Sequence, residues 1–342
     1  LVVVHKSFLI DQWRTSIAKF VPNATVGLIR GPKCQVEDCD IVIAMLQTLS
    51  SRGLSKKISY TFGLVIVDEA HHVCAPVFSR ITPLFWSRYI LALSATPRRR
   101  DGLERILYWT CGPIAFEAER EPVSGHAIMV TVPHVNPIIH MTFRKRPNCM
   151  RMLSDLADNH ERNMIIVNAI RTCRAENRCI IVLSELRRHL KMLEDLLACP
   201  VIYLIGGQKK KKKKTATPPA PAAVYLATYA FSSEGLDLPQ LNTLILATPR
   251  SNIKQSLGRI MRRPDHAIQP LVIDLVERYS LFLHESYKRR HIYKKAGLDV
   301  VVTTPSKLQH VLNGAEDVSP TPKVLDQPPS DASDGRERVV FL

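Results

Sequence analysis

Two adjacent carboxylates, Asp68 and Glu69, follow a run of apolar or glycine residues at 62–67. The run is rich in β-branched residues, as in a buried parallel strand with helices on both faces of its sheet. Open α/β sheets bind their ligands at the carboxyl ends of such strands. An aspartate there can hold Mg²⁺ through oxygen, and a neighbouring glutamate can polarise a water molecule. A strand that simply ends at polar residues fits the same pattern, so other parts of the chain must decide.

Two arginines, Arg259 and Arg262, lie three residues apart at the end of a predicted helix, 253–261. Residues at this spacing face the same way on a helix, and Gln255 precedes them on that face. Guanidinium groups form forks that match phosphate oxygens. A solvated helix face is the alternative, and it is the default interpretation unless these residues, with Gln255 and Gly258, belong to a recognisable motif.

The segments that would position these residues alternate between strands and helices. In the first part of the chain we predict a helix at 8–20 and strands at 1–4, 24–29, 40–44, 62–67 and 89–93. In the second part we predict helices at 163–177, 185–198 and 253–261, and strands at 179–183, 201–205, 223–227, 244–247 and 271–275. This alternation is typical of doubly wound parallel sheets. The two runs predict an α/β fold with two parallel-sheet lobes in tandem.

Composition shifts suggest the domain limits. We place the first lobe at 1–118, the second lobe at 119–302 and a disordered tail, rich in Pro, Ser and Asp, at 303–342. Residues 208–223 are a lysine-rich, low-complexity insert in a surface loop, which fits a solvated loop, a phosphate contact or a nuclear import signal. The β-rich segment 130–141 contains two prolines, so we expect an edge strand or a crossing segment.

The charge of the chain favours a polyanionic partner. The 342 residues contain 47 Lys and Arg against 31 Asp and Glu, a net charge of +16. Nucleic acid and an anionic membrane surface both suit such an excess. No run of 18 apolar residues occurs, so we expect no membrane span. The 8 cysteines lack any C-x-x-C spacing, and we interpret them as reduced thiols of an intracellular protein, cytoplasmic or nuclear, or present in a virion.

Four short motifs occur in a fixed order along the two runs. They are Asp-Glu-Ala-His at 68–71, Ser-Ala-Thr at 94–96, Ala-Thr through Ser-Glu-Gly-Leu-Asp at 227–237, and Gln-Ser-Leu-Gly-Arg-Ile-Met-Arg at 255–262. Together they resemble the superfamily 2 helicases over residues 1 to about 300. The stretches 227–249 and 276–297 are similar to the XPB-like branch and its poxvirus transcript-release relatives. The resemblance implies two RecA-like lobes, ATP and Mg²⁺ as cofactors, and nucleotide in the cleft between the lobes.

The resemblance also implies roles for single residues. Asp68 would hold Mg²⁺ through water, Glu69 would activate the attacking water, and His71 would link the nucleotide to the second lobe. Arg259 and Arg262 look like arginine fingers. Ser94 and Thr96 resemble the motif that couples hydrolysis to movement. Three further residues would contact the nucleotide: Gly235, Asp237 and Gln255.

Nucleic acid would run over loops that follow the strand ends. The residues placed for it are His5, Lys6, Arg30, Gln47, Thr48, Ser184 and Thr228. Such contacts to phosphates read no base sequence. We expect DNA, with RNA or a hybrid left open, and transcription or replication machinery as further partners. The basic stretch 288–290 fits a solvated helix face and a nucleic-acid contact equally well.

One departure from the family pattern stands out. No Gly-x-x-x-x-Gly-Lys-Ser/Thr loop, which cradles the β and γ phosphates, occurs in the 342 residues. The chain opens inside an apolar run, so we expect a truncated chain that binds ATP poorly and does not hydrolyse it at a useful rate. The rival interpretation is a pseudo-helicase that binds nucleic acid as a scaffold. A restriction-enzyme motor is a second rival, for which no nuclease motif is present.

Overall fold

The computed structural model divides the chain into two compact units, Leu1–Glu119 and Arg120–Leu342. It describes residues 1–53, 55–75, 79–94, 102–117, 123–134, 137–205, 222–233, 238, 240–261, 268–313 and 338–341. Four predicted site residues lie outside the described residues: Thr96, Gly235, Asp237 and Arg262. The lysine run of the predicted insert also lies outside them. Each unit is described by itself below.

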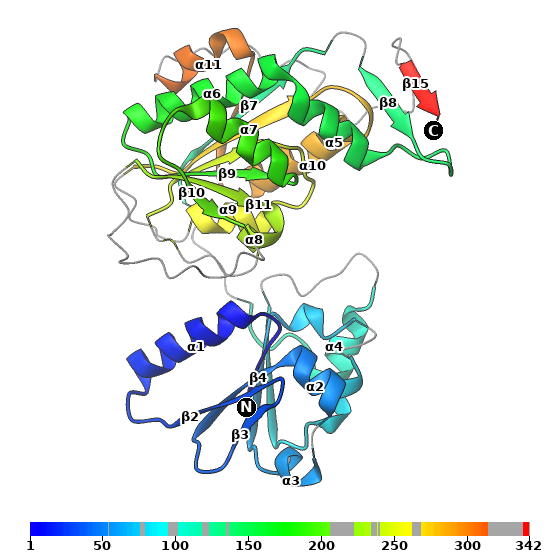
Figure 1. Ribbon diagram of the computed structural model, residues 1–342, viewed down its shortest axis with the longest axis vertical. Coiled ribbons are helices and arrows are strands. Elements are labelled where there is room, and N and C mark those ends of the chain that lie inside the picture. The colour runs from blue at the N-terminus through cyan, green and yellow to red at the C-terminus, as the bar shows by residue number, and fades with distance from the viewer. Residues whose placement is uncertain are drawn as a thin grey trace. The chain divides into compact units, whose positions relative to one another are not determined.

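The first unit is built on a six-stranded sheet of order β3-β2-β4-β1-β5-β6, drawn in blue and cyan in Figure 1. Its strands are β1 (Val2–Val4), β2 (Val26–Arg30), β3 (Lys33–Gln35), β4 (Ile41–Met45), β5 (Leu64–Asp68) and β6 (Tyr89–Leu93). Only β3 is antiparallel to its neighbour, because a tight turn at Gly31 joins it to β2. The other strands are parallel, since the chain crosses back over a face of the sheet between them.

Helices cover both faces of this sheet. They are α1 (Ser7–Phe20), α2 (Leu46–Arg52), α3 (Lys56–Ser59) and α4 (Glu104–Cys111), with 3-10 turns η1 (Ala70–His72) and η2 (Ser79–Leu84). On one face, α1 packs Leu9, Ile10 and Ile17 against alternate residues of β1 and β4. On the other, Leu46, Leu49, Ile81 and Leu107 cover Val65 and Val67. Strands buried on both faces account for the continuous apolar runs seen in the sequence.

The second unit contains a seven-stranded, fully parallel sheet of order β10-β11-β9-β12-β13-β7-β14. Its strands are β7 (His126–Val132), β9 (Ile180–Ser184), β10 (Ile202–Leu204), β11 (Val224–Thr228), β12 (Thr243–Leu246), β13 (Leu271–Glu277) and β14 (Asp299–Thr303). Its helices are α5 (Cys149–Asp158), α6 (His160–Ala175), α7 (Arg187–Leu197), α8 (Tyr229–Ser233), α9 (Lys254–Ile260), α10 (Ser280–Lys295) and α11 (Pro305–Leu312). The α/β class with two parallel-sheet bodies is therefore confirmed.

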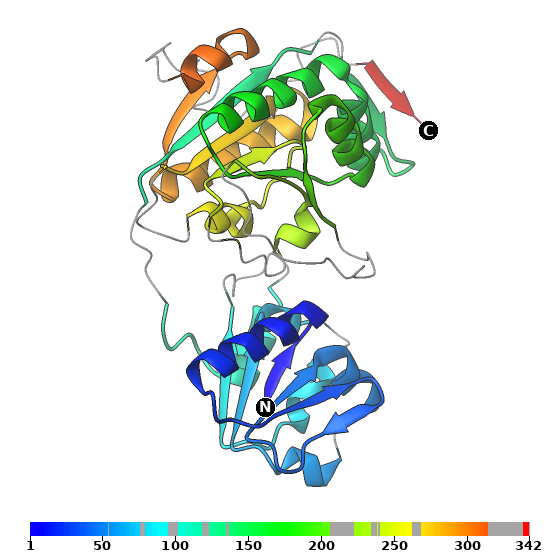
Figure 2. The ribbon, with the colours of Figure 1, turned by 60° about the vertical axis from the view of Figure 1, so that its left-hand side comes forward.

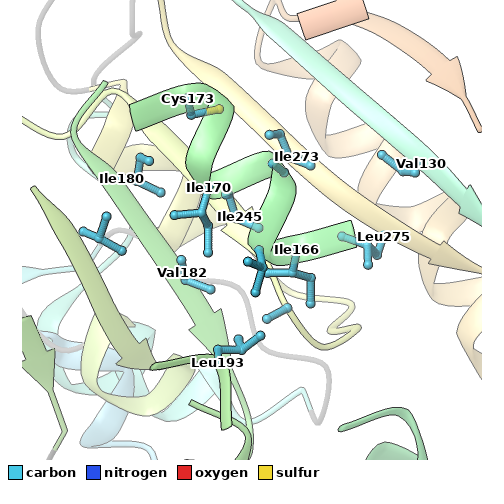
Figure 3. Packing of buried hydrophobic residues seen from close by; sticks show 14 of the residues in the cluster. Val130, Ile166, Ile170, Cys173, Ile180, Val182, Leu193, Ile245, Ile273 and Leu275 are labelled. Atoms are coloured by element: carbon cyan, nitrogen blue, oxygen red, sulfur yellow. The ribbon is translucent and has the colours of Figure 1, made fainter. Parts of the chain in front are cut away.

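The core of the second unit lies on both faces of its sheet. Helices α6, α7 and α11 cover one face, and α8, α9 and α10 cover the other. Figure 3 shows Ile166, Ile170 and Cys173 of α6 above the strand residues Ile180 and Ile245. Each fully buried Ile or Leu contributes about 1.5–3 kcal/mol relative to an exposed one. Figure 2 shows the same layering from the side.

The prediction of an edge or crossing segment at 130–141 is wrong for its first part. Strand β7 lies inside the sheet, with β13 on one side and β14 on the other. Pro133 falls one residue beyond the end of β7, so it removes no hydrogen bond from the ladder. After Pro137, strand β8 (Ile138–Met141) leaves the main sheet and pairs in parallel with β15 (Arg338–Phe341). These two strands protrude from the body of the second unit in Figure 1.

The prediction of a disordered tail beginning at 303 is also wrong for its first residues. Pro305 begins α11, where its missing N–H costs no hydrogen bond. Leu308 is 4% exposed and packs with α6 in the core. Pro305 thus starts α11, and the apolar side of this helix packs against α6 and holds it in the fold. Among the described residues, no helix combines the length and the hydrophobicity that a membrane span requires.

Candidate functional site

The predicted site residues of the first unit meet at one edge of its sheet. Because β2, β4, β1, β5 and β6 are parallel, their carboxyl ends lie on the same side. In strand order this edge carries Arg30, Thr48, His5, Asp68 and Ser94. The chain builds β2 and β4 on one side of β1, and then β5 and β6 on the other. Such a reversal is where open α/β sheets form their ligand crevice.

Both oxygens of the Asp68 carboxylate are held by hydrogen bonds. The indole Nε1 of Trp13, on α1, donates to Oδ2 across 2.9 Å, and the backbone N–H of Glu69 donates to Oδ1 across 2.9 Å. The carboxylate is therefore fixed at the end of β5 while each oxygen keeps a free lone pair. This geometry suits a carboxylate that orients water around a cation.

The backbone of Glu69 is left-handed, with φ 49° and ψ 50°. For a residue with a Cβ this conformation costs roughly 1–2 kcal/mol. Strained residues of this kind concentrate at functional sites, because the surrounding structure must hold them there. The strain turns the chain sharply from β5 into η1 and sets Glu69 beside the end of the strand.

His71 connects the ends of β5 and β6. Its Nδ1 lies 3.0 Å from the Ser94 hydroxyl oxygen and 3.4 Å from Oε2 of Glu69. The predicted coupling residue Ser94 and the predicted catalytic residues therefore form one contact network.

The side chain of His5 is buried rather than available to nucleic acid. It is 4% exposed and stacks on the ring of His72 at a centroid distance of 3.9 Å. Burial, and then the neighbouring His72 and Lys6, lower the pKa of His5 to about 3. Neither ring nitrogen has a hydrogen-bond partner within the described part of the chain. Packing against η1 covers this side chain, so the predicted contact of His5 with nucleic acid would have to come from its backbone.

The other predicted nucleic-acid residues of this unit remain at the edge. Gln47 is exposed and donates from Nε2 to the His5 carbonyl across 2.6 Å. Thr48 accepts a hydrogen bond at Oγ1 from the Gly31 N–H at 3.0 Å, and Arg30 is exposed beside it. Lys6 is half-buried in the loop after β1. Side chains thus tie three neighbouring strand-end loops together, and Arg30 is an exposed cation on the surface that they form.

In the second unit, Ser184 and Thr228 end two adjacent parallel strands, β9 and β11. Thr228 is 9% exposed and its Oγ1 accepts from the Phe231 N–H at 3.4 Å. Ser184 is fully buried, and its hydroxyl lies 3.1 Å from Nδ1 of His189. For Ser184, the predicted contact with nucleic acid would therefore have to come from its backbone. Its hydroxyl instead positions the His189 ring, whose Nε2 donates to Asn163 across 2.8 Å.

Helix α9 carries two predicted nucleotide-contacting residues. Arg259 and Gln255 lie one turn apart, both half-buried. The Nε of Arg259 donates to the Ser232 carbonyl at 3.3 Å, at the end of α8. The two helices are also joined by hydroxyls of Ser232 and Ser256, 3.1 Å apart. Arg259 is thereby held where the segment containing Gly235 and Asp237 begins.

Two buried ion pairs were not predicted from the sequence. Arg162 of α6 donates from Nε to Glu277 across 2.7 Å, and Glu277 also bonds His134. Burial alone would raise the pKa of Glu277, but the Arg162 charge and the bond to His134 hold it below its usual value. The sequence contained a signal for this pair, since Glu277 is the last residue of the buried strand β13 and acidic residues are seldom buried without partners.

The second ion pair joins Arg289 of α10 to Asp274 of β13 at 2.7 Å, with both side chains fully buried. Tyr293 donates its hydroxyl to the same Asp274 oxygen at 2.9 Å. Burial opposes charge on Arg289, yet Asp274 and Tyr293 raise the pKa of its guanidinium. Both interpretations offered for 288–290, a solvated face or a nucleic-acid contact, are wrong for Arg289.

These buried side chains hold the segment that leads into α9. Arg162 donates from Nη1 to the Ala247 carbonyl at 2.7 Å, and the Tyr229 hydroxyl donates to the Thr248 carbonyl. The N–H of Glu185 donates to the Thr248 hydroxyl at 2.9 Å. The loop between β12 and α9 is thus hydrogen-bonded to α6, to α8 and to the residue after β9. These three contacts fix the position from which α9 starts.

Comparisons with known proteins agree with this geometry. Residues 1–99 match the family model described as "Type III restriction enzyme, res subunit". Over 313 residues the chain is 30% identical to "Putative ATP-dependent RNA helicase L396" of Acanthamoeba polyphaga mimivirus, covering 86% of this chain and 59% of that protein. It is 25% identical to "Putative ATP-dependent RNA helicase QP509L" of African swine fever virus, covering 90% of this chain and 66% of that one. The chain thus spans less than two thirds of both relatives.

A solved structure shows the same fold at low sequence identity. Yeast (S. cerevisiae) Dbp5 bound to RNA and ADP BeF3 matches with a TM-score of 0.59 and 11% identity, covering 91% of this chain and 79% of that one. The agreement extends over both units of the chain.

Proposed function

We propose that the chain is a superfamily 2 helicase and forms the motor part of an ATP-dependent nucleic-acid helicase or translocase, as its four motifs and its similarity to viral helicases support. One observation carries the proposal. Asp68, strained Glu69, His71 and Ser94 form a connected set at the carboxyl ends of β5 and β6. A structural protein gains nothing from a strained glutamate beside a fixed carboxylate, whereas phosphoryl transfer to water needs both groups.

Asp68 is the proposed outer ligand of Mg²⁺. This ion usually binds through one or two carboxylates plus substrate phosphates and keeps several waters. Within the described residues no cluster of three His, Cys, Asp or Glu side chains could hold a metal by itself. That finding fits a cation bound mainly by phosphate and water, with Asp68 orienting the waters. When bound there, Mg²⁺ would neutralise charge on the phosphates of ATP.

Glu69 is the proposed group that orients the attacking water and accepts its proton. Its backbone is left-handed, and His71 lies between the Glu69 carboxylate and the Ser94 hydroxyl. Arg259 is the proposed positive charge for the transferred phosphoryl group, with Gln255 one turn before it. Arg262, Thr96, Gly235 and Asp237 are proposed members of the same machinery on sequence grounds alone.

The proposed ligand is nucleic acid of low sequence specificity. The net charge of +16 and the exposed Arg30 and Gln47 at the sheet edge support this. The sequence led us to expect DNA, whereas two relatives are named RNA helicases. Both relatives are viral, so we propose a viral protein that acts within the infected cell on transcribed or replicating nucleic acid.

The test measures ATP hydrolysis with and without single-stranded DNA or RNA. It uses a polypeptide that carries residues 1–342 together with a Gly-x-x-x-x-Gly-Lys-Ser/Thr loop. We expect stimulated hydrolysis, abolished by Glu69→Gln while ATP binding persists. Glu37→Gln, in the exposed turn before β4, is the matched control and should leave hydrolysis unchanged. If nucleic acid binds but does not stimulate ATP hydrolysis, the result would instead support a pseudo-helicase that binds nucleic acid as a scaffold.

A further inference from the structure

A short basic loop in the second unit presents a fully exposed aromatic ring. The loop consists of Thr142, Phe143, Arg144, Lys145 and Arg146 and joins β8 to α5; it is called the 142–146 loop below. Phe143 is 95% exposed, the highest value among the large apolar side chains described. The three basic residues that follow it are exposed as well. An aromatic ring that is exposed to water beside three cations indicates a role in binding a ligand rather than a role in packing the core.

Hydrogen bonds around Thr142 give the loop a defined shape. The Thr142 N–H donates to the Arg146 carbonyl at 2.7 Å, and the Lys145 N–H donates to the Thr142 carbonyl at 2.9 Å. The Thr142 hydroxyl donates to the same Arg146 carbonyl at 3.0 Å. Lys145 adopts a left-handed backbone, φ 54°, which closes the turn. The ring of Phe143 is therefore held out by the backbone, and binding would order few additional groups.

The charge of the loop is not neutralised within the described structure. None of Arg144, Lys145 and Arg146 forms an ion pair with a described residue. The nearby acidic residues already have partners, since Asp155 bonds His140 and Asp158 bonds Arg188. The loop therefore offers three free cations to an anionic ligand.

The loop leaves from the edge of the sheet that carries the candidate site. Strand β7 ends at this edge, where His134 bonds Glu277. The chain returns to the same edge at the start of α6, where Arg162 contacts Glu277 and Ala247. Between these two anchors, β8 projects outward from the body of the unit (Figures 1 and 2). The segment that carries the loop therefore begins and ends at the edge where Thr228 and the segment before α9 lie.

We propose that the 142–146 loop binds single-stranded nucleic acid, with Phe143 stacking on an unpaired base and Arg144, Lys145 and Arg146 contacting the flanking phosphates. The inference rests on the proposed function for its ligand class. Every base offers a π-face, so stacking on one rigid aromatic ring is strong but tolerant of sequence. Basic side chains beside the ring would hold the backbone without reading bases. Such a contact suits a motor that must move along any sequence.

Equilibrium binding of a fluorescein-labelled single-stranded 15-mer of dT or U to the full chain tests the proposal, with no ATP present. Phe143→Ala should weaken binding roughly 5- to 150-fold, as expected for the loss of one stacked base. Phe143→Trp should retain affinity, and its added fluorescence should be quenched when the oligonucleotide binds. Because Phe143 is exposed, neither change threatens folding.

Phe20→Ala is the matched control. Phe20 is 74% exposed, lies beside a lysine and ends α1, the helix that starts at the candidate edge of the first sheet and runs away from it. Affinity should stay within about twofold of the unmodified chain, as for a surface change away from the site. The combined change Arg144→Gln, Lys145→Asn and Arg146→Gln should weaken binding. It should also make the slope of log affinity against log salt shallower, by about 0.7 for each phosphate that the loop no longer neutralises.

The outcomes separate this inference from the proposed function. If the chain binds the oligonucleotide and Phe143→Ala binds equally well, the inference is overturned while the helicase proposal stands. If the chain binds no single strand at all, both fail. The last experiment measures binding of the chain and of Phe143→Ala to vesicles of anionic phospholipid. Phe143-dependent binding to vesicles, without Phe143-dependent binding to the oligonucleotide, would assign the loop to a membrane surface and overturn the inference.

Discussion

The indole Nε1 of Trp13 lies 2.9 Å from Oδ2 of Asp68 and donates a hydrogen bond to it. Trp13 belongs to α1, the helix that follows the central strand β1. A helix far from Asp68 in the chain therefore orients the carboxylate at the end of β5. Partners of this kind around a metal-orienting carboxylate change metal affinity or activity when they are removed.

Trp13→Phe should keep most of the apolar packing but remove this donor. We expect the Mg²⁺ concentration for half-maximal ATP hydrolysis to rise roughly tenfold, because Asp68 would no longer be held in one orientation. The measurement is a Mg²⁺ titration of nucleic-acid-stimulated hydrolysis in the loop-containing polypeptide. Trp86→Phe, at a side chain that is 62% exposed, is the control. An unchanged Mg²⁺ dependence for Trp13→Phe would remove this hydrogen bond from the mechanism.

Arg259→Ala should lower stimulated ATP hydrolysis roughly thousandfold, because arginines at the transferred phosphoryl group stabilise its charge in the transition state. Binding of ATP, measured separately, should change far less. Lys254→Ala serves as the control, since Lys254 is exposed on the same helix. Equal rates for Arg259→Ala and Lys254→Ala would assign Arg259 a structural role, through its bond to the Ser232 carbonyl.

Arg289→Met should destabilise the second unit by about 3–5 kcal/mol, because it leaves the buried Asp274 carboxylate without its cation. Replacing both residues, Arg289→Met with Asp274→Leu, should cost less than the single change. Hydrogen exchange of the β13 amides, together with urea unfolding, measures the loss. Arg188→Met breaks an exposed pair with Asp158 and should cost at most about 1 kcal/mol. A double variant less stable than Arg289→Met would contradict the prediction.

The second unit should lose stability as the pH falls below neutrality, because of His189. Burial, and then the nearby Arg162 charge, lower the pKa of His189 to about 3. The unfolded chain binds a proton at this residue near pH 6.5 and the folded chain does not, so acid favours unfolding. Between pH 7 and pH 5 the expected loss is about 2 kcal/mol. All of this stability is present above pH 6.5.

Hydrogen exchange of the β9 amides at several pH values checks this. His189→Gln should flatten the pH dependence, although it costs stability at pH 7 because the bonds to Ser184 and Asn163 change. The exposed His126→Gln is the control and should retain the slope. If the stability of the unmodified chain is constant from pH 7 to pH 5, protonation of His189 does not destabilise the second unit.

Much of the fold could be predicted from the sequence because each buried parallel strand corresponds to a continuous run of apolar residues. Strand β6 occupies the predicted residues 89–93, and α1 extends the predicted 8–20 by one residue. The α/β class follows from such runs, and the resemblance to the superfamily 2 helicases follows from four motifs placed after them. These signals depend only on neighbouring residues, so no tertiary contact is needed to recognise them.

Tertiary contacts decided which polar residues face outward. His5, Ser184 and Arg289 all occupy positions that local sequence assigns to a loop or an exposed face, yet each is buried in the folded chain. His5 is covered by η1, Ser184 is bonded to His189, and Arg289 meets Asp274 across a helix–strand interface. The sequence alone determined the two α/β lobes, the resemblance to the superfamily 2 helicases and the carboxylates at the end of β5. Only the folded chain decided what holds those carboxylates, because a hydrogen bond such as that from Trp13 depends on how α1 crosses the sheet.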